Sequence, residues 1–185
     1  MTDIGARQLD AVLTALGEQL AAAGETAHLV VIGGSGLLAI DAISRSTRDV
    51  DVVALERHGQ LVPADPLPAA VAGAAALVAR DLGLEPGWLN PGPTSLLDLG
   101  LPAGLSDRLI RRGYGSALRV SVASRIDQIF FKLYAAADRR EPRDFADLRQ
   151  LEPTAAGLRA GADAQHARPL RRCDRAGARR PWSPG

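Results

Sequence analysis

The sequence predicts an α/β protein, and three features of the chain support this class. Residues 7–24 carry large apolar side chains at helical spacing, which predicts an amphipathic helix. Residues 28–32 form a short, nearly continuous apolar run, which is typical of a buried strand. Residues 49–55 open with two acids that alternate with valines, which predicts a second strand. We therefore expect a small mixed sheet covered by helices.

Further segments alternate between helical and extended patterns. Gly33–Gly36 turns the chain after the first strand, and residues 37–43 are predicted to form a short helix. Beyond the second strand we expect, in order, a loop over 57–66, an alanine-rich helix over 68–82, a Gly- and Pro-rich connector over 83–94, a strand over 96–101, a helix over 105–112 and a strand over 118–122.

Two helices are predicted to follow the last strand. Ser124 opens the first of them, and Ser124 with Asp127 resembles a capping box. Its buried stripe is expected to consist of Ile126, Ile129, Phe130, Leu133 and Ala137. Pro142 suits the first turn of a final helix that runs to about residue 151, with Phe145 and Leu148 buried.

The composition divides the chain into three parts, at residues 1–90, 91–151 and 152–185. The formal net charge is only +1, and residues 1–150 hold 15 basic and 18 acidic side chains, which excludes a protein that coats nucleic acid through bulk charge. The Arg-rich last part has few apolar side chains and is predicted to be a disordered tail. Two interpretations of it stay open, a nucleic-acid-binding tail and a translation from another reading frame.

Cysteine use and hydropathy point to a cytoplasmic protein. The single cysteine, Cys173, excludes a disulfide framework within the chain and a cysteine-based metal site. No apolar run reaches the ~20 residues of a membrane helix. Residues 1–5 are neither basic nor followed by an apolar signal core. We therefore expect no membrane partner.

The clearest chemical signal joins a glycine-rich turn to two acids on the next strand. The segment Val30–Ser35 ends a strand in Gly-Gly-Ser, and Asp49 and Asp51 lie two residues apart. Glycines let the backbone approach a bulky anion, and free N–H groups at a helix start bind phosphate. Both carboxylates face one side of the strand. Because paired carboxylates and phosphate oxygens together bind Mg²⁺, the pattern indicates phosphoryl or nucleotidyl transfer.

This pattern resembles the motif of the polymerase-beta-type nucleotidyltransferase superfamily, in which hydrophobic-Gly-[Gly/Ser]-Ser precedes acid-hydrophobic-acid. Here 13 residues separate Ser35 from Asp49, which is long for that superfamily. The residues of the motif, Gly-Gly-Ser-Gly-Leu-Leu followed by Arg-Ser-Thr-Arg-Asp-Val-Asp-Val, resemble those of the AbiEii/MenT branch. This branch consists of bacterial nucleotidyltransferases that are often the toxins of toxin–antitoxin pairs. Lys132, followed by the Arg-Asp-x-x-Asp-Leu run of residues 143–148, supports the same branch.

The resemblance implies a fold, an activity and a set of site residues. It implies a nucleotidyltransferase core with a small mixed sheet at residues 1–90 and a mostly helical C-terminal lobe at 91–151. It also implies transfer of an NMP from an NTP to a hydroxyl, with Mg²⁺ or Mn²⁺ as cofactor, the 3′ end of tRNA as acceptor and a cognate antitoxin as partner. The implied metal ligands are Asp49 and Asp51, the implied nucleotide contacts are Gly33, Gly34, Ser35, Arg48 and Lys132, and the implied further active-site acids are Asp144 and Asp147.

Lys132 has independent support from the composition and from its helix. It is the chain's single lysine beside 21 arginines. Arg125, Gln128 and Lys132 form a polar stripe that we expect to face a cleft. Asp144 and Asp147 have simpler interpretations, in which the helix dipole favours Asp144 and Asp147 pairs with Arg143 or Arg140. A third carboxylate is common in the superfamily, and Asp98 is the strand-like candidate.

Two other classes of protein stay open at this point. Gly34-x-Gly36-x-x-Ala39, with Glu56 about twenty residues on, also fits a dinucleotide-binding fingerprint of the Rossmann type. Against a Rossmann-like oxidoreductase, two acids at the start of a buried strand are costly without a metal or partner. The second class is a catalytically inactive interaction domain of the nucleotidyltransferase fold.

Three smaller expectations concern single side chains. Thr47 lies two residues before Asp49, so strand geometry would point its hydroxyl to the side of the carboxylates and make it a possible regulatory position; the alternative is a local hydrogen bond at the end of a loop. Trp88 and Tyr134 are expected to pack in the core or between lobes. Several arginines are candidates for a path along RNA phosphates, namely Arg108, Arg111, Arg112, Arg139, Arg140 and Arg143.

Overall fold

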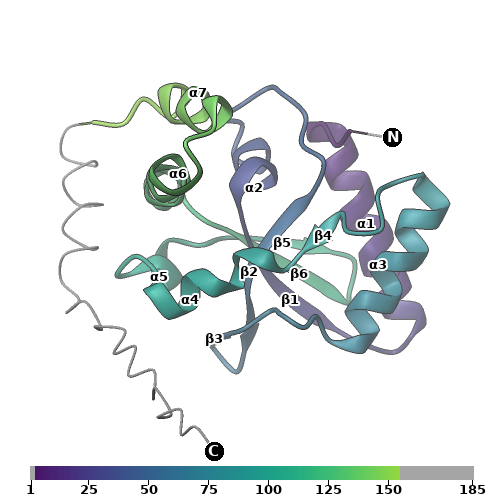
Figure 1. The fold of residues 1–185 in the computed structure, drawn as a ribbon. Helices are drawn as coiled ribbons and strands as arrows, with labels where there is room; N and C mark the ends of the chain where they lie inside the picture. Colours follow the sequence, from purple (N-terminus) through teal and green to yellow (C-terminus); the bar gives the residue numbers. More distant parts are fainter. Residues whose placement is uncertain (1–2, 155–185) are drawn as a thin grey trace, which may run out of the picture.

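The computed structural model describes residues 3–154, which fold into a mixed sheet with helices on both of its faces (Figure 1). The helices of this part of the chain are α1 (Ala6–Ala22), α2 (Gly33–Ala39), α3 (Ala69–Leu82), α4 (Leu96–Leu99), α5 (Leu105–Arg108), α6 (Arg125–Arg139), α7 (Pro142–Gln150) and the 3₁₀ turn η1 (Gly92–Ser95). The strands are β1 (Ala27–Ile32), β2 (Val50–Arg57), β3 (Gln60–Val62), β4 (Leu89–Asn90), β5 (Ile110–Tyr114) and β6 (Leu118–Val122).

The sheet has the order β3-β2-β1-β6-β5, and the short β4 pairs with β2 beside this path. β1 lies antiparallel to β2 and parallel to β6. β2 also pairs with β3 in an antiparallel ladder and with β4 in a parallel one. β5 and β6 form an antiparallel edge pair. This mixed sheet with its helices confirms the predicted α/β class.

Side chains alternate between two cores because successive residues of a strand face opposite sides of a sheet. On one face, Leu29 and Val31 of β1 join the buried stripe of α1 and the alanine-rich face of α3, which lie side by side. On the other face, Val30 and Ile32 meet Phe131 of α6 and side chains from the α5 region. A strand covered on both faces must be apolar throughout, which explains the continuous apolar run of β1.

The strongest sequence patterns are confirmed as elements. Residues 7–24 form α1, residues 28–32 lie in β1, residues 68–82 form α3, and 118–122 is β6. The predicted strand at 49–55 is β2, which begins at Val50, one residue after Asp49, and continues to Arg57. Trp88 is fully buried as expected, and its Nε1 donates a hydrogen bond to the carbonyl oxygen of Ala75 in α3 at 3.0 Å.

Several weaker element predictions are wrong. Residues 96–101 form no strand, because α4 makes one helical turn there that ends at Gly100, whose φ is 92°. The helix expected over 105–112 ends at Arg108, and the chain then pairs with β6 as β5. The supposed loop over 57–66 contains β3, which follows a two-residue hairpin turn in which both residues have positive φ. The helix expected over 37–43 begins earlier, at Gly33.

The predicted burial of the last two helices is also partly wrong. Ile126 of α6 and Phe145 of α7 are 44% and 45% exposed. Asp127, Gln128 and Lys132 are buried instead. The reason is that α6 packs its polar face against α2, α5 and α7, so the hydrophobic stripe alone does not determine which side is covered. The side chain of Ser124 donates to Asp127 Oδ2 and makes no capping bond to the backbone.

The antiparallel pairing of β1 and β2 decides one open alternative. A Rossmann unit needs two parallel strands joined by a crossover helix. Here the glycine-rich segment leads into a helix of seven residues and the chain returns antiparallel to β1. The Rossmann-like interpretation of Gly34–Ala39 is therefore wrong.

The three-part division of the chain stays a prediction. Strands from 1–90 and from 91–151 share one sheet, while α6 and α7 lie together at one end of it (Figure 1). Apart from residues 152–154, the predicted tail at 152–185 lies outside the described residues. Within residues 3–154, none of the helices combines the length and the apolar character that a membrane crossing requires.

Candidate active site

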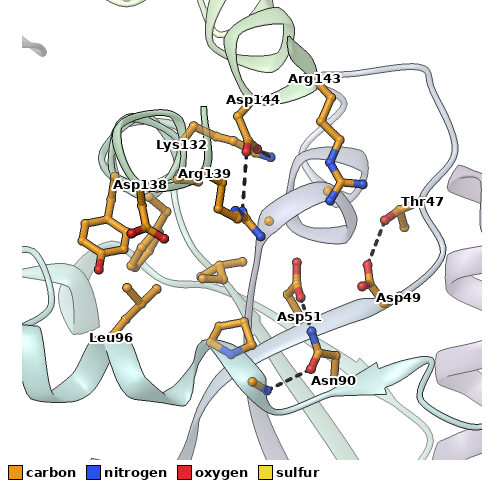
Figure 2. A pocket seen from close by; sticks show the side chains of 18 of the residues that line it. Thr47, Asp49, Asp51, Asn90, Leu96, Lys132, Asp138, Arg139, Arg143 and Asp144 are labelled. Atoms are coloured by element: carbon orange, nitrogen blue, oxygen red, sulfur yellow. Dashed lines mark hydrogen bonds and ion pairs between the residues drawn. The ribbon is translucent and has the colours of Figure 1, made fainter. Parts of the chain in front are cut away.

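A cavity of about 370 Å³ lies where the end of β1, the start of β2 and the helices α6 and α7 meet. Gly33 and Gly34 at the start of α2 form one wall, and the connector around η1 forms another (Figure 2). The loop before β2 contributes Arg45, Thr47 and Asp49. The cavity therefore collects segments that are far apart in the sequence around the two predicted metal ligands.

Asp49 and Asp51 both line this cavity, as the strand spacing predicts. Thr47 Oγ1 donates to Asp49 Oδ1 at 3.2 Å, and Asn90 Nδ2 donates to Asp51 Oδ1 at 2.8 Å. Burial, together with the charge of Asp49, raises the pKa of Asp51 to about 6, although the bond from Asn90 opposes the shift. The two carboxylates repel each other, and each accepts one hydrogen bond from a neighbouring side chain. A cation between them would relieve this repulsion.

The glycines at the start of α2 are required by close approach to these acids. Gly33 has a φ of +69°, and a Cβ placed on it would overlap the carboxylate of Asp51. A Cβ on Gly34 would lie 2.9 Å from Thr47 Oγ1. The run of small residues thus lets the backbone of α2 lie directly against the acidic start of β2.

Thr47 faces the site because its backbone is fixed. Its N–H and carbonyl groups form a two-bond bridge with Ile4, at 2.9 and 2.7 Å. The side chain then reaches Asp49 and lines the cavity (Figure 2). Thr47 thus faces the cavity, and it also makes the local hydrogen bond of the alternative interpretation, so its regulatory role stays a prediction.

Two predicted nucleotide contacts lie away from the cavity. The hydroxyl of Ser35 is fully buried, donates to the carbonyl oxygen of Ile32 at 3.3 Å and accepts from the Asp51 N–H at 3.4 Å. It joins the start of α2 to both strands. Arg48 is exposed and does not line the cavity, whereas Arg45 does.

Lys132 is at the centre of a buried ionic cluster. Its Nζ lies 2.8 Å from Asp144 Oδ1 and 2.7 Å from Asp147 Oδ2, and its side chain is only 7% exposed. Arg45 completes the cluster with two hydrogen bonds to Asp147, at 2.9 and 2.6 Å. Burial alone would raise the pKa of Asp147, but the bonds from Arg45 and Lys132 outweigh it and the pKa is lowered. The cluster joins α6, α7 and the loop before β2.

The structure also brings to the cavity Asn90, which was not predicted, and Arg139 and Arg143, which were expected only as candidates for a path along RNA phosphates. Arg139 reaches between Asp144 and Asp51, with its Nη2 at 3.6 Å from Asp144 Oδ2, and Arg143 points into the cavity from α7 (Figure 2). Asn90 reaches Asp51 because β4 pairs with β2. The clustering of arginines after Lys132 was the feature of the sequence that could have predicted Arg139 and Arg143 at the site. No feature of the sequence around Asn90 predicts its contact with Asp51.

The polar stripe predicted on α6 is only partly at the cavity. Lys132 lines it, but Gln128 is fully buried against α2 at Gly36, and Arg125 is exposed and donates to the carbonyl oxygen of Gln150. Asp98, the candidate third carboxylate, lies on the helical turn α4 rather than on a strand. Tyr134 lines the cavity instead of packing in a core.

The donor set suits Mg²⁺ bound together with a substrate. Within residues 3–154, no group of three or more His, Cys, Asp or Glu side chains is arranged to hold a metal ion. Mg²⁺ keeps several waters and is commonly bound by one or two carboxylates and by substrate phosphates. Asp49 and Asp51 are two such carboxylates, and Arg45, Arg139 and Arg143 line the same cavity.

A fold and a site of this kind define a nucleotidyltransferase, and comparison with known proteins agrees. Residues 7–152 match the family DUF6036, described as a nucleotidyltransferase of unknown function. This match covers most of the chain, which therefore belongs to that family. No curated protein and no solved structure matches the chain. The family confirms the predicted nucleotidyltransferase class, whereas the finer AbiEii/MenT assignment stays a prediction.

Proposed function

We propose that this protein transfers an NMP from an NTP to a hydroxyl acceptor, with Mg²⁺ or Mn²⁺ held by Asp49 and Asp51. The observation that carries the proposal is the pair of carboxylates at the start of β2, Asp49 just before the strand and Asp51 within it, which share a cavity with Arg45, Arg139 and Arg143. Acids and cations in one cavity suit a metal–triphosphate complex, because the metal needs carboxylates and the phosphates need cations.

The chain's own residues divide the work as follows. Asp49 and Asp51 orient the ion, which when bound stabilises negative charge on phosphate oxygens. Arg139 and Arg143 are exposed cations at the cavity and bind the triphosphate. Lys132 keeps α6 and α7 in place through Asp144 and Asp147, with its ammonium already paired to both.

The reaction is a displacement at the α-phosphorus of the NTP. The acceptor hydroxyl oxygen forms a bond to this phosphorus, and its proton leaves to solvent. The bond between the α-phosphorus and the bridging oxygen breaks, and pyrophosphate leaves with that electron pair. Arginines at the cavity stabilise the leaving group, since guanidinium groups pair well with phosphate oxygens.

The acceptor and the biological role are the more specific part of the proposal. From the motif resemblance we propose the 3′ end of tRNA as acceptor, a translation-blocking toxin as role and a cognate antitoxin as partner. The test is transfer of label from each α-labelled NTP to total RNA, with and without Mg²⁺. We expect metal-dependent labelling of tRNA-sized species. An inactive interaction domain would label nothing, and tight metal-independent binding of NAD(H) would contradict the proposal.

Removal of one acid is expected to stabilise the metal-free protein. Asp51→Asn removes the repulsion with Asp49 and keeps an oxygen that accepts from Asn90. Relief of about 1 kcal/mol corresponds to a rise of roughly 2–4 °C in Tm for a chain of this size. Thermal unfolding with a chelator measures it. Added Mg²⁺ and NTP should stabilise the wild-type protein and not the variant; equal stabilisation of both would contradict the metal assignment.

A negative charge at position 47 is expected to prevent binding of the NTP phosphates. Thr47→Glu places a carboxylate beside Asp49 and should abolish NTP binding, whereas Thr47→Val keeps the shape and should retain most of it. A phosphate on Thr47 would add a charge of about −1.5 to −2 at the same place. Calorimetric titration with NTP and Mg²⁺ compares the two variants. Normal affinity in Thr47→Glu would show that this position does not influence the site.

A further inference from the structure

Helix α6 presents two neighbouring stripes to the cavity. Phe131, Tyr134, Ala135 and Asp138 follow the i, i+3, i+4, i+7 spacing of one helical face. Lys132 and Arg139 form the second stripe, displaced by one residue. The second stripe faces Asp144 and the acidic start of β2, so the first stripe lines the remaining part of the cavity, away from the metal ligands (Figure 2).

The part of the cavity away from the metal ligands is lined mainly by apolar side chains. Ile32, Pro93 and Leu96 line it together with Phe131 and Ala135 of α6. The ring of Phe131 is buried and meets Phe130 edge-on, with centroids 5.6 Å apart and an interplanar angle of 80°. Tyr134 adds a half-buried aromatic side chain to the same wall. Aromatic and aliphatic walls of this kind favour a planar, poorly hydrated ring.

Asp138 is the charged side chain of this stripe, one helical turn beyond Tyr134 (Figure 2). The other cavity carboxylates have donors from neighbouring side chains: Asp49 from Thr47, Asp51 from Asn90 and Asp144 from Lys132. Among residues 3–154, Asp138 makes no hydrogen bond or ion pair. An ionised carboxylate accepts hydrogen bonds and donates none, so a ligand that reaches Asp138 would be recognised through its own donors.

We propose that this apolar end binds the base of the NTP and that Asp138 selects guanine. The inference rests on the proposed function and names its nucleotide. Guanine carries two adjacent donors, N1–H and the 2-amino group, which match the two oxygens of one carboxylate. Adenine and cytosine present an amino group beside a ring nitrogen that accepts. Uracil presents one N–H between two carbonyl groups. With each of these three bases, one carboxylate oxygen of Asp138 would therefore face a ring nitrogen or carbonyl oxygen that also accepts, and only one hydrogen bond could form.

The size of the preference follows from the exposure of Asp138. A hydrogen bond to a charged group changes affinity by about tenfold to a hundredfold. Because Asp138 is exposed before the ligand binds, the lower end of this range applies. The wild-type protein is therefore expected to bind GTP about tenfold more tightly than ATP.

Direct binding tests the inference without requiring turnover. The full chain is titrated calorimetrically with GTP, ITP and ATP in the presence of Mg²⁺; ITP differs from GTP only in lacking the 2-amino group. We expect the order GTP, ITP, ATP, from tightest to weakest. Asp138→Ala should weaken GTP about tenfold and leave ATP unchanged. The matched control Asp81→Ala, which removes an exposed carboxylate from α3 outside the cavity, should change neither.

The outcomes separate this inference from the proposed function. If the nucleotides bind equally well, or if Asp138→Ala keeps the GTP preference, guanine selection by Asp138 is overturned while nucleotidyl transfer from any NTP can still be observed. If the preference is present and depends on Asp138, the base subsite is supported even where the RNA acceptor is wrong. If no nucleotide binds, both proposals fail.

Discussion

The substitutions Asp49→Asn and Asp51→Asn are each expected to lower the rate of nucleotidyl transfer by at least about a hundredfold. This factor corresponds to a loss of about 2.7 kcal/mol of transition-state stabilisation. Asparagine is close to aspartate in size, so the change removes charge and leaves the packing at the cavity intact. The metal stabilises charge on the reacting phosphate by several kcal/mol, and within residues 3–154 no third His, Cys, Asp or Glu side chain is grouped with these two carboxylates to compensate for a lost one.

The control for this prediction is Asp81→Asn, an exposed acid on α3 that pairs with Arg80 away from the cavity. Label transfer to RNA is measured together with Mn²⁺ binding by electron paramagnetic resonance in the presence of NTP. Each site variant should lose both transfer and Mn²⁺ binding, and the control should lose neither. Near wild-type transfer in either site variant would refute the assignment of Asp49 and Asp51 as metal ligands.

The substitution Lys132→Met is expected to lower the free energy of unfolding by about 3–5 kcal/mol. This is the typical result of removing one partner from a buried ion pair. Methionine has a long unbranched side chain without charge. Its presence would leave Asp144 and Asp147, both fully buried, with one cationic partner fewer each. Asp144 would keep only the longer contact with Arg139 at 3.6 Å.

Urea denaturation measures this effect, and Arg80→Met is the matched control. Arg80 pairs with Asp81 on the surface, so its loss should cost at most about 1 kcal/mol. Adding Asp144→Asn to the Lys132→Met variant should recover part of the stability, because it removes one buried charge. A loss below about 1 kcal/mol in Lys132→Met would instead favour a lysine that is free for substrate, as the motif resemblance implies.

Local patterns predicted the centre of the fold well. The β1–α2–β2 unit is continuous in the chain, and its apolar runs and glycines are set by burial and close approach within that unit. Asp49 and Asp51 share a side because a strand has a period of two. The nucleotidyltransferase class followed from this unit, and the family match agrees with it.

Segments without a dominant pattern were predicted poorly. β5 and β3 are short edge strands, and each is defined by its pairing with a neighbour rather than by its own residues. The leucines of 96–101 were expected to form a strand, yet Leu96 and Leu97 pack against the second core from the helical turn α4, and Leu101 packs there just after it. Propensity is weak in such short segments, so tertiary contacts determine the conformation.

The sequence by itself determined the α/β class, the glycine-rich segment after β1 and the spacing of Asp49 and Asp51 at the start of β2, because each depends on residues that are neighbours in the chain. Only the tertiary structure decided what surrounds that pair. It brought Asn90 to Asp51 through β4, it enclosed Lys132 between two acids of α7, and it placed Arg139 in the cavity. The physical reason is that the face a helix or strand buries depends on the elements packed against it, which may come from any distance along the chain.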